Sequence, residues 1–522
     1  MKTRFWNSDW FAGLIITILV VVFSGSASFQ SLERSAYDWG VRSTSKAASE
    51  RIAIIAIDDA SVANIGRWPW PRDLHANLIK KLSDGGAKVI GQTLFFSEPQ
   101  IDRGTIYIRD LIDFYSNASF NDIPADIDEL SMTLNLEADN EAVAKILEFY
   151  LQSNMSSRLS QDIETLKVQL IEAEQALNTD AKLAASMDYA KNVVLAMTFT
   201  PGKVHEPPDK ELGSYVLKNA LPNIRDRVSA KSQGLFPIPT NRATPPIPEI
   251  GQFASAIGHL NFFQDIDGGI RNEALVLKHY DRFYPSISLQ IAAKSLNLDN
   301  NDIQINLAES VQLGSLTIET DSFLQMNTFY YADTDGFPAY QIDSYFDVIT
   351  DKIPIEKYKD KIVLIGATAS GVGTSLVTPV NSAMPPVLVL AHTVSSILNE
   401  DFFIQPKWGR WIQICALFLA GLYFMLIMPH LKAGVGFVLT LALLMTLVVA
   451  HYILMTSSTI WIPLMTPAVL LATGYPLITS KRFLVTERGR TKSDDESSES
   501  NRMLGIAIQG QGQLDSARWM KR

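Results

Sequence analysis

The chain has 522 residues, 47% of them hydrophobic, which makes it more apolar than most soluble enzymes. Its formal net charge is −10 and its Lys and Arg residues form no cluster before the C-terminal tail, so a nucleic-acid partner is not expected. The single cysteine, Cys415, excludes an intramolecular disulfide and a zinc site built from cysteines. The composition therefore favours a membrane protein that is too long for one compact domain.

Four uncharged apolar stretches predict transmembrane helices, since about 20 such residues cross the hydrocarbon core of a bilayer. They are residues 11–29, 411–428, 435–454 and 460–478. Basic residues precede the first stretch, separate the second from the third and follow the fourth. The positive-inside rule therefore predicts that both termini, including residues 1–10, are cytoplasmic and that residues 30–407 are extracytoplasmic. A cleaved signal peptide is the alternative for the first stretch, because Lys2 and Arg4 precede it and small residues end it.

The region 30–407 has the pattern of an α/β domain. Continuous runs rich in β-branched residues predict strands buried on both faces, at 52–57, 89–91, 193–195 and 362–365. Helical patterns separate these runs, for example at 72–82, which follows a proline, and at 287–296. We therefore expect a mixed sheet with flanking helices.

Residues 134–192 predict a long helical insertion in this domain. Its apolar residues step by four and three along a heptad seam, which includes Leu159, Ile163, Leu166, Leu170 and Leu177. One interpretation is a surface helix packed on its own domain, and the other is a contact between two copies of the chain. The second interpretation predicts a homodimer.

One edge of the predicted sheet collects the candidate ligand-binding residues. If the strands that end at Ile57, Phe95 and Ile365 run parallel, their following loops meet at that edge, where α/β proteins bind ligands. The candidates on these loops are Asp58, Asp59, Trp68, Trp70, Arg72, Glu98 and Thr368. Helix capping is the alternative role for the two aspartates, and packing in a proline-aromatic lid is the alternative for the two tryptophans.

Motifs for catalysis or metal binding are weak. Ser61, His75 and Asp59 lack the surroundings of a nucleophile elbow. The glycine-rich segment 366–373 lacks the Lys-Ser/Thr ending of a P-loop and predicts a tight turn. Residues 265–269 predict a hairpin turn rather than a calcium loop, because Phe263 occupies the position where an EF-hand places its first Asp. We therefore expect no catalytic residue, no metal site and no cofactor.

Several motifs resemble the type-2 domain of the CHASE family of extracellular sensors, over residues 31–403. They are the segments at 57–61, 66–72, 86–91, 96–99, 193–197, 258–261, 284–286 and 361–369, together with Asp267, Gly268, Arg271, Thr378 and Pro379. The resemblance implies an outer sensor domain followed by three membrane helices, as in receptors of the bacterial inner membrane that carry kinase or cyclase outputs. The catalytic motifs of those outputs do not occur in the chain.

The chain departs from the CHASE pattern at several polar positions. Thr93 and Thr374 stand where the relatives typically have Asp, and residues 385–390 replace an expected Pro-Gly-Val-Glu-x-His motif. If those polar groups bind a ligand in the relatives, the resemblance implies a different binding ability for this chain.

The tail, residues 479–522, predicts a charged linker and then the start of a tetratricopeptide repeat. The repeat pattern consists of Leu504, Gly505, Ile508, Gly512 and Ala517. One half-unit of such a repeat cannot bury its apolar face, so we expect either a following output region or a partner that binds the tail.

We therefore expect a transmembrane sensory receptor module that detects an extracytoplasmic signal and relays it to a cytoplasmic output. Its expected partners are membrane lipid, an unknown extracytoplasmic small molecule or protein, and a second copy of the chain. The alternatives are a membrane scaffold that binds an extracytoplasmic protein, and an extracytoplasmic enzyme.

Overall fold

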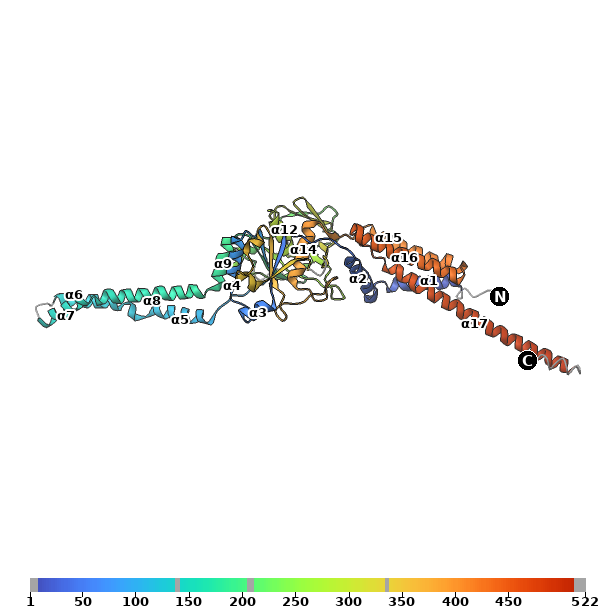
Figure 1. The fold of residues 1–522 in the computed structure, drawn as a ribbon, viewed down its shortest axis with the longest axis horizontal. Coiled ribbons are helices and arrows are strands. Elements are labelled where there is room, and N and C mark those ends of the chain that lie inside the picture. The colour runs from blue at the N-terminus through green and yellow to red at the C-terminus, as the bar shows by residue number, and fades with distance from the viewer. Residues whose placement is uncertain (1–7, 137–140, 204–210, 334–337, 511–522) are drawn as a thin grey trace. The chain divides into compact units, whose positions relative to one another are not determined.

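The computed structural model describes residues 8–136, 141–203, 211–333 and 338–510 (Figure 1). The chain divides into two compact units. The helical unit consists of Met1–Lys46, Gln264–Gly269 and Phe402–Arg522, and the sheet unit consists of Ala47–Phe263 and Ile270–Asp401.

The sheet unit is built on a mixed sheet that has nine strands among the described residues. Their order is β14 (Gln341–Ser344), β1 (Ile52–Ile57), β15 (Ile362–Ala367), β2 (Val89–Gln92), β3 (Val193–Pro201), β5 (Pro239–Thr244), β8 (Val276–His279) and β9 (Arg282–Pro285), with β6 (Ala256–His259) also paired to β3. The strands from β14 to β3 and the strand β6 run parallel. The strand β5 is antiparallel to β3, and β9 is antiparallel to β8. The predicted mixed sheet is confirmed, and each predicted β-branched run lies in a strand.

Helices cover both faces of the parallel strands. On one face, Ile55, Ile90 and Leu195 pack in a core with residues of α4 (Arg72–Asp84) and α9 (Thr179–Ala190). The other face carries α12 (Ile287–Ser295) and α14 (Pro386–Asn399). Gly91 and Gly366 lie so close to Ile291 and Val387 of these helices that an added Cβ would meet them at less than 3 Å. Strands buried on both faces explain why their sequences are continuous apolar runs.

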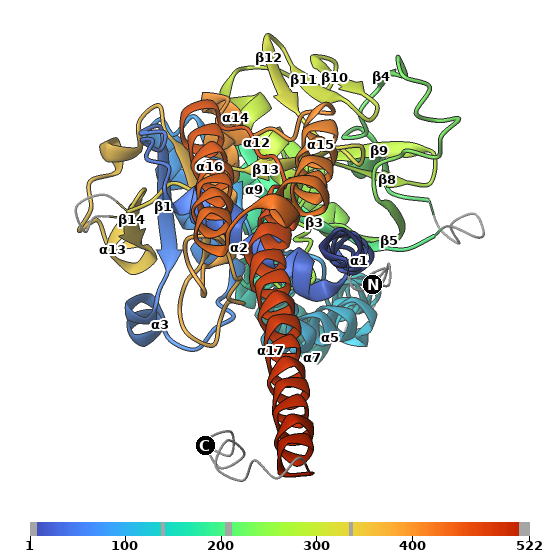
Figure 2. The same cartoon turned by 90° about the vertical axis from the view of Figure 1, so that its right-hand side faces the viewer.

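Smaller elements complete the sheet unit. The strands β10 (Ile303–Asn306), β11 (Ser310–Leu313) and β12 (Leu316–Glu319) form an antiparallel sheet with β4 (Asn223–Arg225) parallel to β10 (Figure 2), and β7 (Asn272–Ala274) pairs with β13 (Gln325–Thr328). The short helices are α3 (Asp59–Ile65), α10 (Ser214–Leu217), α11 (Pro248–Gly251), α13 (Tyr345–Ile349) and η3 (Ile355–Tyr358).

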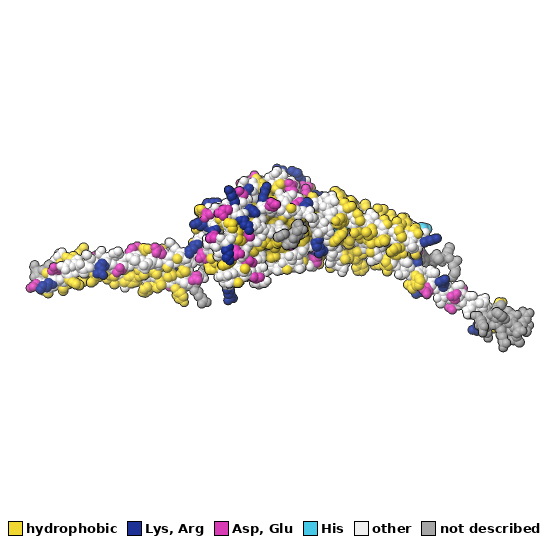
Figure 3. Space-filling model, in the orientation of Figure 1, with side chains coloured by type: hydrophobic (Ala, Val, Ile, Leu, Met, Phe, Trp, Pro, Cys, Tyr) yellow, Lys and Arg dark blue, Asp and Glu magenta, His cyan; other side chains and the backbone are white. Residues whose placement is uncertain are grey.

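The predicted helical insertion is longer than expected and forms a helical arm between β2 and β3. The arm consists of α5 (Arg103–Asn117), η2 (Ser119–Asn121), α6 (Ile123–Leu136), α7 (Glu141–Ser153) and α8 (Met155–Leu177). The helices α5 and α8 lie side by side (Figure 1), and α6 also contacts α8. Figure 3 shows hydrophobic side chains gathered along one side of this arm.

The helical unit contains the hydrophobic stretches. Its elements are α1 (Asp9–Phe23), α2 (Ala27–Arg42), β16 (Phe402–Phe403), α15 (Gly409–Leu422), the π-helical η4 (Tyr423–Ile427), η5 (Met428–His430), α16 (Ala433–Ser458) and α17 (Met465–Gly510). In Figure 3 the surface of α15 and α16 is mostly hydrophobic. The segments Gly409–His430 and Ala433–Ser458 are each long and apolar enough to cross a membrane, which confirms the second and third predicted spans.

The prediction of four spans is wrong. The first predicted span is broken, because α1 and α2 are bent by 81° at the small residues 24–26, and this pair gives at most a third span among the described residues. The fourth predicted span, 460–478, is not helical over its first residues. Pro463 disfavours a helical conformation of Ile462 before it, and α17 begins only at Met465. The apolar part of α17 before Lys481 is thus shorter than the about 20 residues that a spanning helix requires.

The charged tail is helical where it is described. Residues 491–499 belong to α17 and their side chains are exposed, so the expected linker is a solvated helix. Gly512 and Ala517 of the tetratricopeptide pattern lie outside the described residues, and that pattern stays a prediction.

Candidate functional site

A cleft of about 670 Å³ lies where the parallel strands of the sheet unit end. The loops after β2, β6 and β15 reach it, as do Thr198 within β3 and the N-terminal ends of α4 and α14. Its lining residues are Trp68, Pro69, Trp70, Arg72, His75, Thr93, Leu94, Phe95, Phe96, Ser97, Glu98, Pro99, Gln100, Thr198, Leu260, Phe262, Ala367, Val372, Gly373, Thr374 and Pro386. The cleft therefore lies at the edge of the sheet to which the strand-end rule assigned the candidate residues.

Four of the seven candidate ligand residues line this cleft, and three do not. Trp68, Trp70, Arg72 and Glu98 are in its wall, whereas Asp58, Asp59 and Thr368 are not. The carboxylate of Asp59 accepts a hydrogen bond from the backbone N–H of Ser370 at 3.0 Å, which holds the loop after β15. The backbone N–H of Thr368 donates to the Ile57 carbonyl at 3.0 Å. Asp59 and Thr368 therefore join the loops that follow β1 and β15.

Asp58 has the alternative role of a helix cap. Its Oδ1 accepts hydrogen bonds from the Ser61 backbone N–H at 2.8 Å, from the Ser61 hydroxyl at 2.5 Å and from the Ser344 hydroxyl at 2.9 Å. Partial burial opposes ionisation of Asp58, but these hydrogen bonds outweigh it and lower the pKa of the carboxyl. Asp58 therefore caps α3 and ties it to the end of β14.

Arg72 is buried and its guanidinium is engaged by the protein. Nη1 donates to Asp180 Oδ1 at 2.6 Å, Nη2 donates to the Glu98 carbonyl, and the group lies 5.3 Å from the ring centroid of Phe96. Because a guanidinium that is already paired has little charge left for a ligand, Arg72 shapes the cleft rather than offering a free cation.

Gln100 completes the same network. Its side-chain carbonyl accepts from the Arg72 backbone N–H at 2.8 Å and from the Thr179 hydroxyl at 2.9 Å, and its amide donates to the Trp70 carbonyl at 3.1 Å. The Gln100 backbone N–H donates to the second oxygen of Asp180 at 3.0 Å. The loop at 98–100 is thus fixed to α4 and to the first turn of α9.

Aromatic rings form one wall of the cleft. Trp70 is buried, its Nε1–H donates to the Gly66 carbonyl at 2.9 Å, and its ring lies 5.1 Å from that of Trp68 and 4.9 Å from that of Tyr345. Burial, followed by the charge of Arg72, lowers the pKa of His75 to about 4. His75 is therefore uncharged at neutral pH, with its Nδ1 lying 3.3 Å from the Tyr345 hydroxyl. Trp68 is only half-buried, so part of its ring faces the open cleft.

The departures from the CHASE pattern gather in this cleft. Thr93, Thr374 and Pro386 all line it, and the hydroxyl of Thr93 donates to the Ile365 carbonyl at 3.0 Å. Two positions where the resemblance implies carboxylates therefore carry neutral hydroxyl groups here. The candidate list missed Thr198, which lies within β3, and Phe262, which follows β6. Extending the strand-end rule to the run at 193–195 would have found Thr198.

The other motifs are structural. The hydroxyl of Ser61 contacts that of Ser344 and the ring of His75 contacts the hydroxyl of Tyr345, so each has a structural partner apart from Asp59. The segment 366–373 is a tight turn in which the Val372 N–H donates to the Ala369 carbonyl at 3.2 Å and Gly371 has a φ of 83°. Residues 265–269 also close a turn, with the Gly268 N–H donating to the Asp265 carbonyl at 2.9 Å.

The heptad seam lies on α8, where the arm partly covers it. Leu159, Ile163, Leu170 and Leu177 are half-buried, whereas Leu166 is 43% exposed. The hydroxyl of Tyr115 on α5 donates to the Ile163 carbonyl at 3.0 Å. Packing within the chain therefore accounts for part of the heptad pattern, and the dimer contact stays a prediction.

Comparison with known proteins gives one result. The model of the CHASE2 domain family matches residues 14–423. No curated protein and no solved structure matches the chain. The CHASE2 domain is an extracytoplasmic sensory domain of signalling proteins, and the family points to no catalytic activity. Since the match covers most of the chain, including the sheet unit, the cleft and the first membrane helices, this membrane protein belongs to the CHASE2 domain family.

Proposed function

We propose that this chain is the input module of a transmembrane receptor, in which the cleft binds an extracytoplasmic small molecule and the helical unit relays the binding to a cytoplasmic output. The observation that carries the proposal is the cleft itself, about 670 Å³ of partly open space at the strand ends of a sensor domain. Pockets of this size and aromatic lining hold small ligands in many α/β proteins.

The charges of the cleft favour a neutral or positively charged ligand. Among the described residues that line it, Arg72 alone carries a fixed positive charge, and Asp180 neutralises that charge. Glu98 is exposed at the cleft and contributes a carboxylate. The half-buried ring of Trp68 offers an aromatic face on which an apolar or cationic group can stack.

The relay is supported by α17, which is one continuous helix from Met465 in the helical unit to Gly510 in the charged tail. The chain passes between the helical unit and the sheet unit after Lys46, Phe263, Gly269 and Asp401, so a change in the sheet unit can act on four connections. Such a change is transmitted only if the helices have two discrete arrangements.

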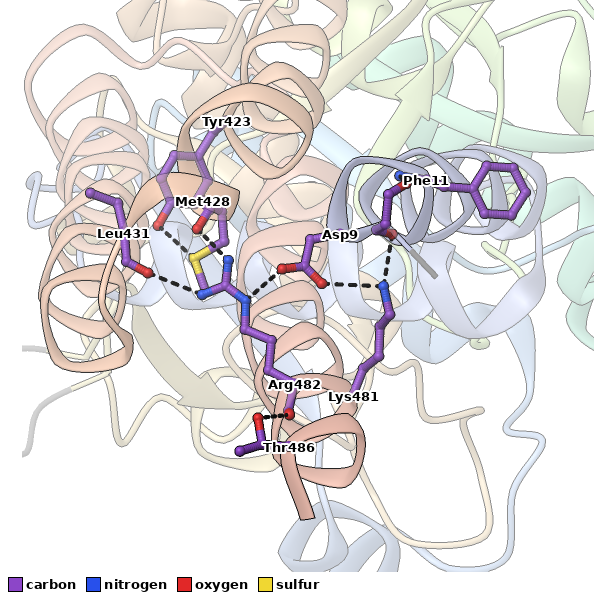
Figure 4. A network of polar contacts seen from close by, with 9 residues as sticks. Asp9, Phe11, Tyr423, Met428, Leu431, Lys481, Arg482 and Thr486 are labelled. Atoms are coloured by element: carbon purple, nitrogen blue, oxygen red, sulfur yellow. Dashed lines mark hydrogen bonds and ion pairs between the residues drawn. The ribbon is translucent and has the colours of Figure 1, made fainter. Parts of the chain in front are cut away.

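A polar clamp joins three parts of the helical unit at the point where α17 becomes charged (Figure 4). Lys481 Nζ donates to the Ser8 carbonyl at 2.7 Å and to Asp9 Oδ1 at 3.2 Å. Arg482 donates to Asp9 Oδ2 at 2.8 Å, to the Leu431 carbonyl at 3.0 Å and to the Met428 carbonyl at 2.7 Å. The clamp fixes α17 to the start of α1 and to the turn before α16, so it supplies an element that can be closed or open and thus serve the relay.

The ligand proposal is tested by filling the cleft at its rim. Thr374 lines the cleft and is exposed, so Thr374→Trp should reduce the cleft volume without disturbing the core, and Ser375→Trp on the same loop is the matched control. We expect mass spectrometry of the purified full chain to detect a small molecule that the Thr374→Trp variant loses and the Ser375→Trp variant keeps. Equal retention by both variants, or no bound molecule from cells grown under any condition, would count against the cleft.

The hydrophobic side of the arm favours a second candidate function, assembly with another protein. Tyr107, Phe114, Met132 and Phe149 on three of its helices are each at least two-thirds exposed. Exposed apolar patches of this kind mark protein contacts. The partner we expect is a second copy of the chain, because pairing of two arms would also bring two charged tails into one assembly.

A further inference from the structure

An apolar cavity in the helical unit has a different character from the cleft. It measures about 340 Å³ and lies between α2, α16 and the first turn of α17. Its walls include Leu32 and Ala36 of α2, Leu447 of α16, Leu464 just before α17, and Ala468 of α17. The exposed lining is almost entirely carbon, so water molecules in the cavity would find few hydrogen-bond partners.

The cavity follows a seam along which α2 and α16 contact each other. Gly40 lies so close to Met455 that an added Cβ would meet its side chain at 2.8 Å. One turn earlier on both helices, His451 Nε2 lies 3.1 Å from the Ala36 carbonyl. A further turn back stand Leu32 and Leu447, which line the cavity. The seam is therefore tight at one end and hollow at the other.

The surroundings of the cavity identify its occupant. The helix α16 is apolar and long enough to cross a membrane, and Val449 and Ile453 beside the seam are about half exposed on its surface. We therefore expect hydrocarbon chains next to the cavity. An apolar hollow that is open to hydrocarbon and repels water is filled by the hydrocarbon, since an empty one loses the dispersion contacts of its walls.

We propose that this cavity is a binding site for one acyl chain of a membrane phospholipid. The chain would contact α2, α16 and α17 at once, and α17 is the helix that continues into the tail. Its occupancy would set the spacing between α2 and α17 next to the contact in which Glu33 Oε2 accepts the Met465 N–H at 3.1 Å. The site is separate from the cleft, so it stands whether or not the cleft binds a small molecule.

Ala468 and Leu464 are the residues at which labelling is read out. They are 4% and 5% exposed, so bulk lipid reaches them only through the cavity. Ser35 lines the cavity and is exposed, so Ser35→Trp should fill it from the rim. Ser31, one turn earlier on the same helix and also exposed, is not in the lining and provides the control Ser31→Trp.

The experiment uses the full chain in vesicles of phosphatidylethanolamine and phosphatidylglycerol. A phospholipid with a diazirine in one acyl chain is the probe, and a free fatty acid with the same diazirine is the comparison. After photolysis we expect mass spectrometry to find the phospholipid on Leu464 or Ala468, with labelling reduced several-fold in Ser35→Trp and unchanged in Ser31→Trp. Ala468→Leu, a smaller filling change, should lower labelling of Leu464 in the same way. Absence of labelling in the wild-type chain, equal labelling in Ser35→Trp, or labelling by the fatty acid alone would overturn the proposal.

Discussion

The guanidinium of Arg72 donates to the carboxylate of Asp180 at 2.6 Å, although 108 residues separate the two in the sequence. The pair joins the first turn of α4 to the first turn of α9, and both side chains are largely buried. Because Asp180 also accepts from the backbone of Gln100, the pair fixes the floor of the cleft to the core of the sheet unit.

Removal of Arg72 should destabilise the sheet unit. In Arg72→Met the carboxylate of Asp180 stays buried without its cation, and breaking a buried pair in this way typically costs about 3–5 kcal/mol. We expect a clear fall in the midpoint of thermal or denaturant unfolding of the full chain. Lys191→Met is the control, since the pair between Lys191 and Asp188 is exposed and should contribute little. Equal midpoints for Arg72→Met and the wild type would contradict the structural role of the pair.

Glu273 should make the sheet unit less stable as the pH rises. The residue is buried on β7, burial raises the pKa of its carboxyl to about 8, and the Ser288 hydroxyl donates to it at 3.0 Å. Between the unfolded pKa near 4.5 and the folded pKa near 8, the unfolded chain releases the proton while the folded chain keeps it. The contribution of this group to stability is therefore full below pH 4.5 and is lost progressively up to pH 8.

Glu273→Gln removes this proton linkage while keeping the shape and an acceptor for Ser288. We expect the variant to unfold at the same denaturant concentration as the wild type near pH 4.5 and at a higher concentration near pH 8. Parallel pH profiles for the two proteins would show that Glu273 is not protonated in the folded state.

Leu166→Lys should weaken the predicted homodimer without unfolding the arm. Leu166 is exposed on α8, and surface substitutions of this kind usually change stability by less than about 0.5 kcal/mol. Mass photometry in mild detergent at micromolar concentration should find dimers of the wild type and monomers of the variant. Thr165→Lys, at the neighbouring exposed position, is the control and should leave the dimer intact. A monomeric wild type, or a variant that dimerises equally well, would remove the seam from consideration.

Arg482→Ala should open the polar clamp. Arg482 supplies three of the clamp contacts, to Asp9, Met428 and Leu431. Hydrogen exchange of the backbone amides should therefore quicken near Asp9 and in the turn at Leu431. Lys492→Ala, which removes an exposed pair with Glu496 on the same helix, should leave those amides unchanged. Identical exchange in Arg482→Ala would mean that the clamp does not hold these helices together.

The clamp also leads to a prediction of membrane topology. Arg482 donates hydrogen bonds to Asp9 and to the Leu431 carbonyl, so we expect all three residues on the same side of the membrane. If α16 crosses the bilayer, the chain from Thr459 to Lys481 then returns to that side through its extended start and the short apolar part of α17. The positive charges nearby predict that this side is cytoplasmic. In a Cys415→Ser background, a cysteine at position 432 should resist an impermeant thiol reagent in intact cells, and a cysteine at position 267 should react. The reverse pattern would invert the topology.

The buried centre of the fold was predictable because its strands are covered on both faces. Such strands need apolar residues at every position, and the runs at Ile52–Ile57 and Ile362–Ala367 have them. The strand β5 was not predictable, because it contains polar residues such as Asn241 and Arg242 and resembles a loop in sequence. The edge that carries the cleft followed from the parallel strands alone.

The roles of individual residues were harder to predict than their location. Nothing near Arg72 in the sequence reveals Asp180 as its partner, so the sequence cannot distinguish a buried ion pair from a ligand-binding group. The heptad seam was ambiguous for a similar reason, since an apolar stripe has the same spacing whether α5 or a second chain covers it. The prediction of the fourth span was wrong because hydropathy alone does not show that Pro463 delays the start of the helix to Met465.

The length of α17 has a mechanical consequence. From Arg482 to Gly510 the helix continues without a proline, and 28 residues at about 1.5 Å each make a rod of roughly 42 Å. If the clamp at Arg482 acts as a fulcrum, a tilt of about 10° there moves the far end sideways by roughly 7 Å, which exceeds one helical turn. A displacement too small to alter the packing around the clamp would thus become a shift large enough to separate or join two bound surfaces at the end of the rod.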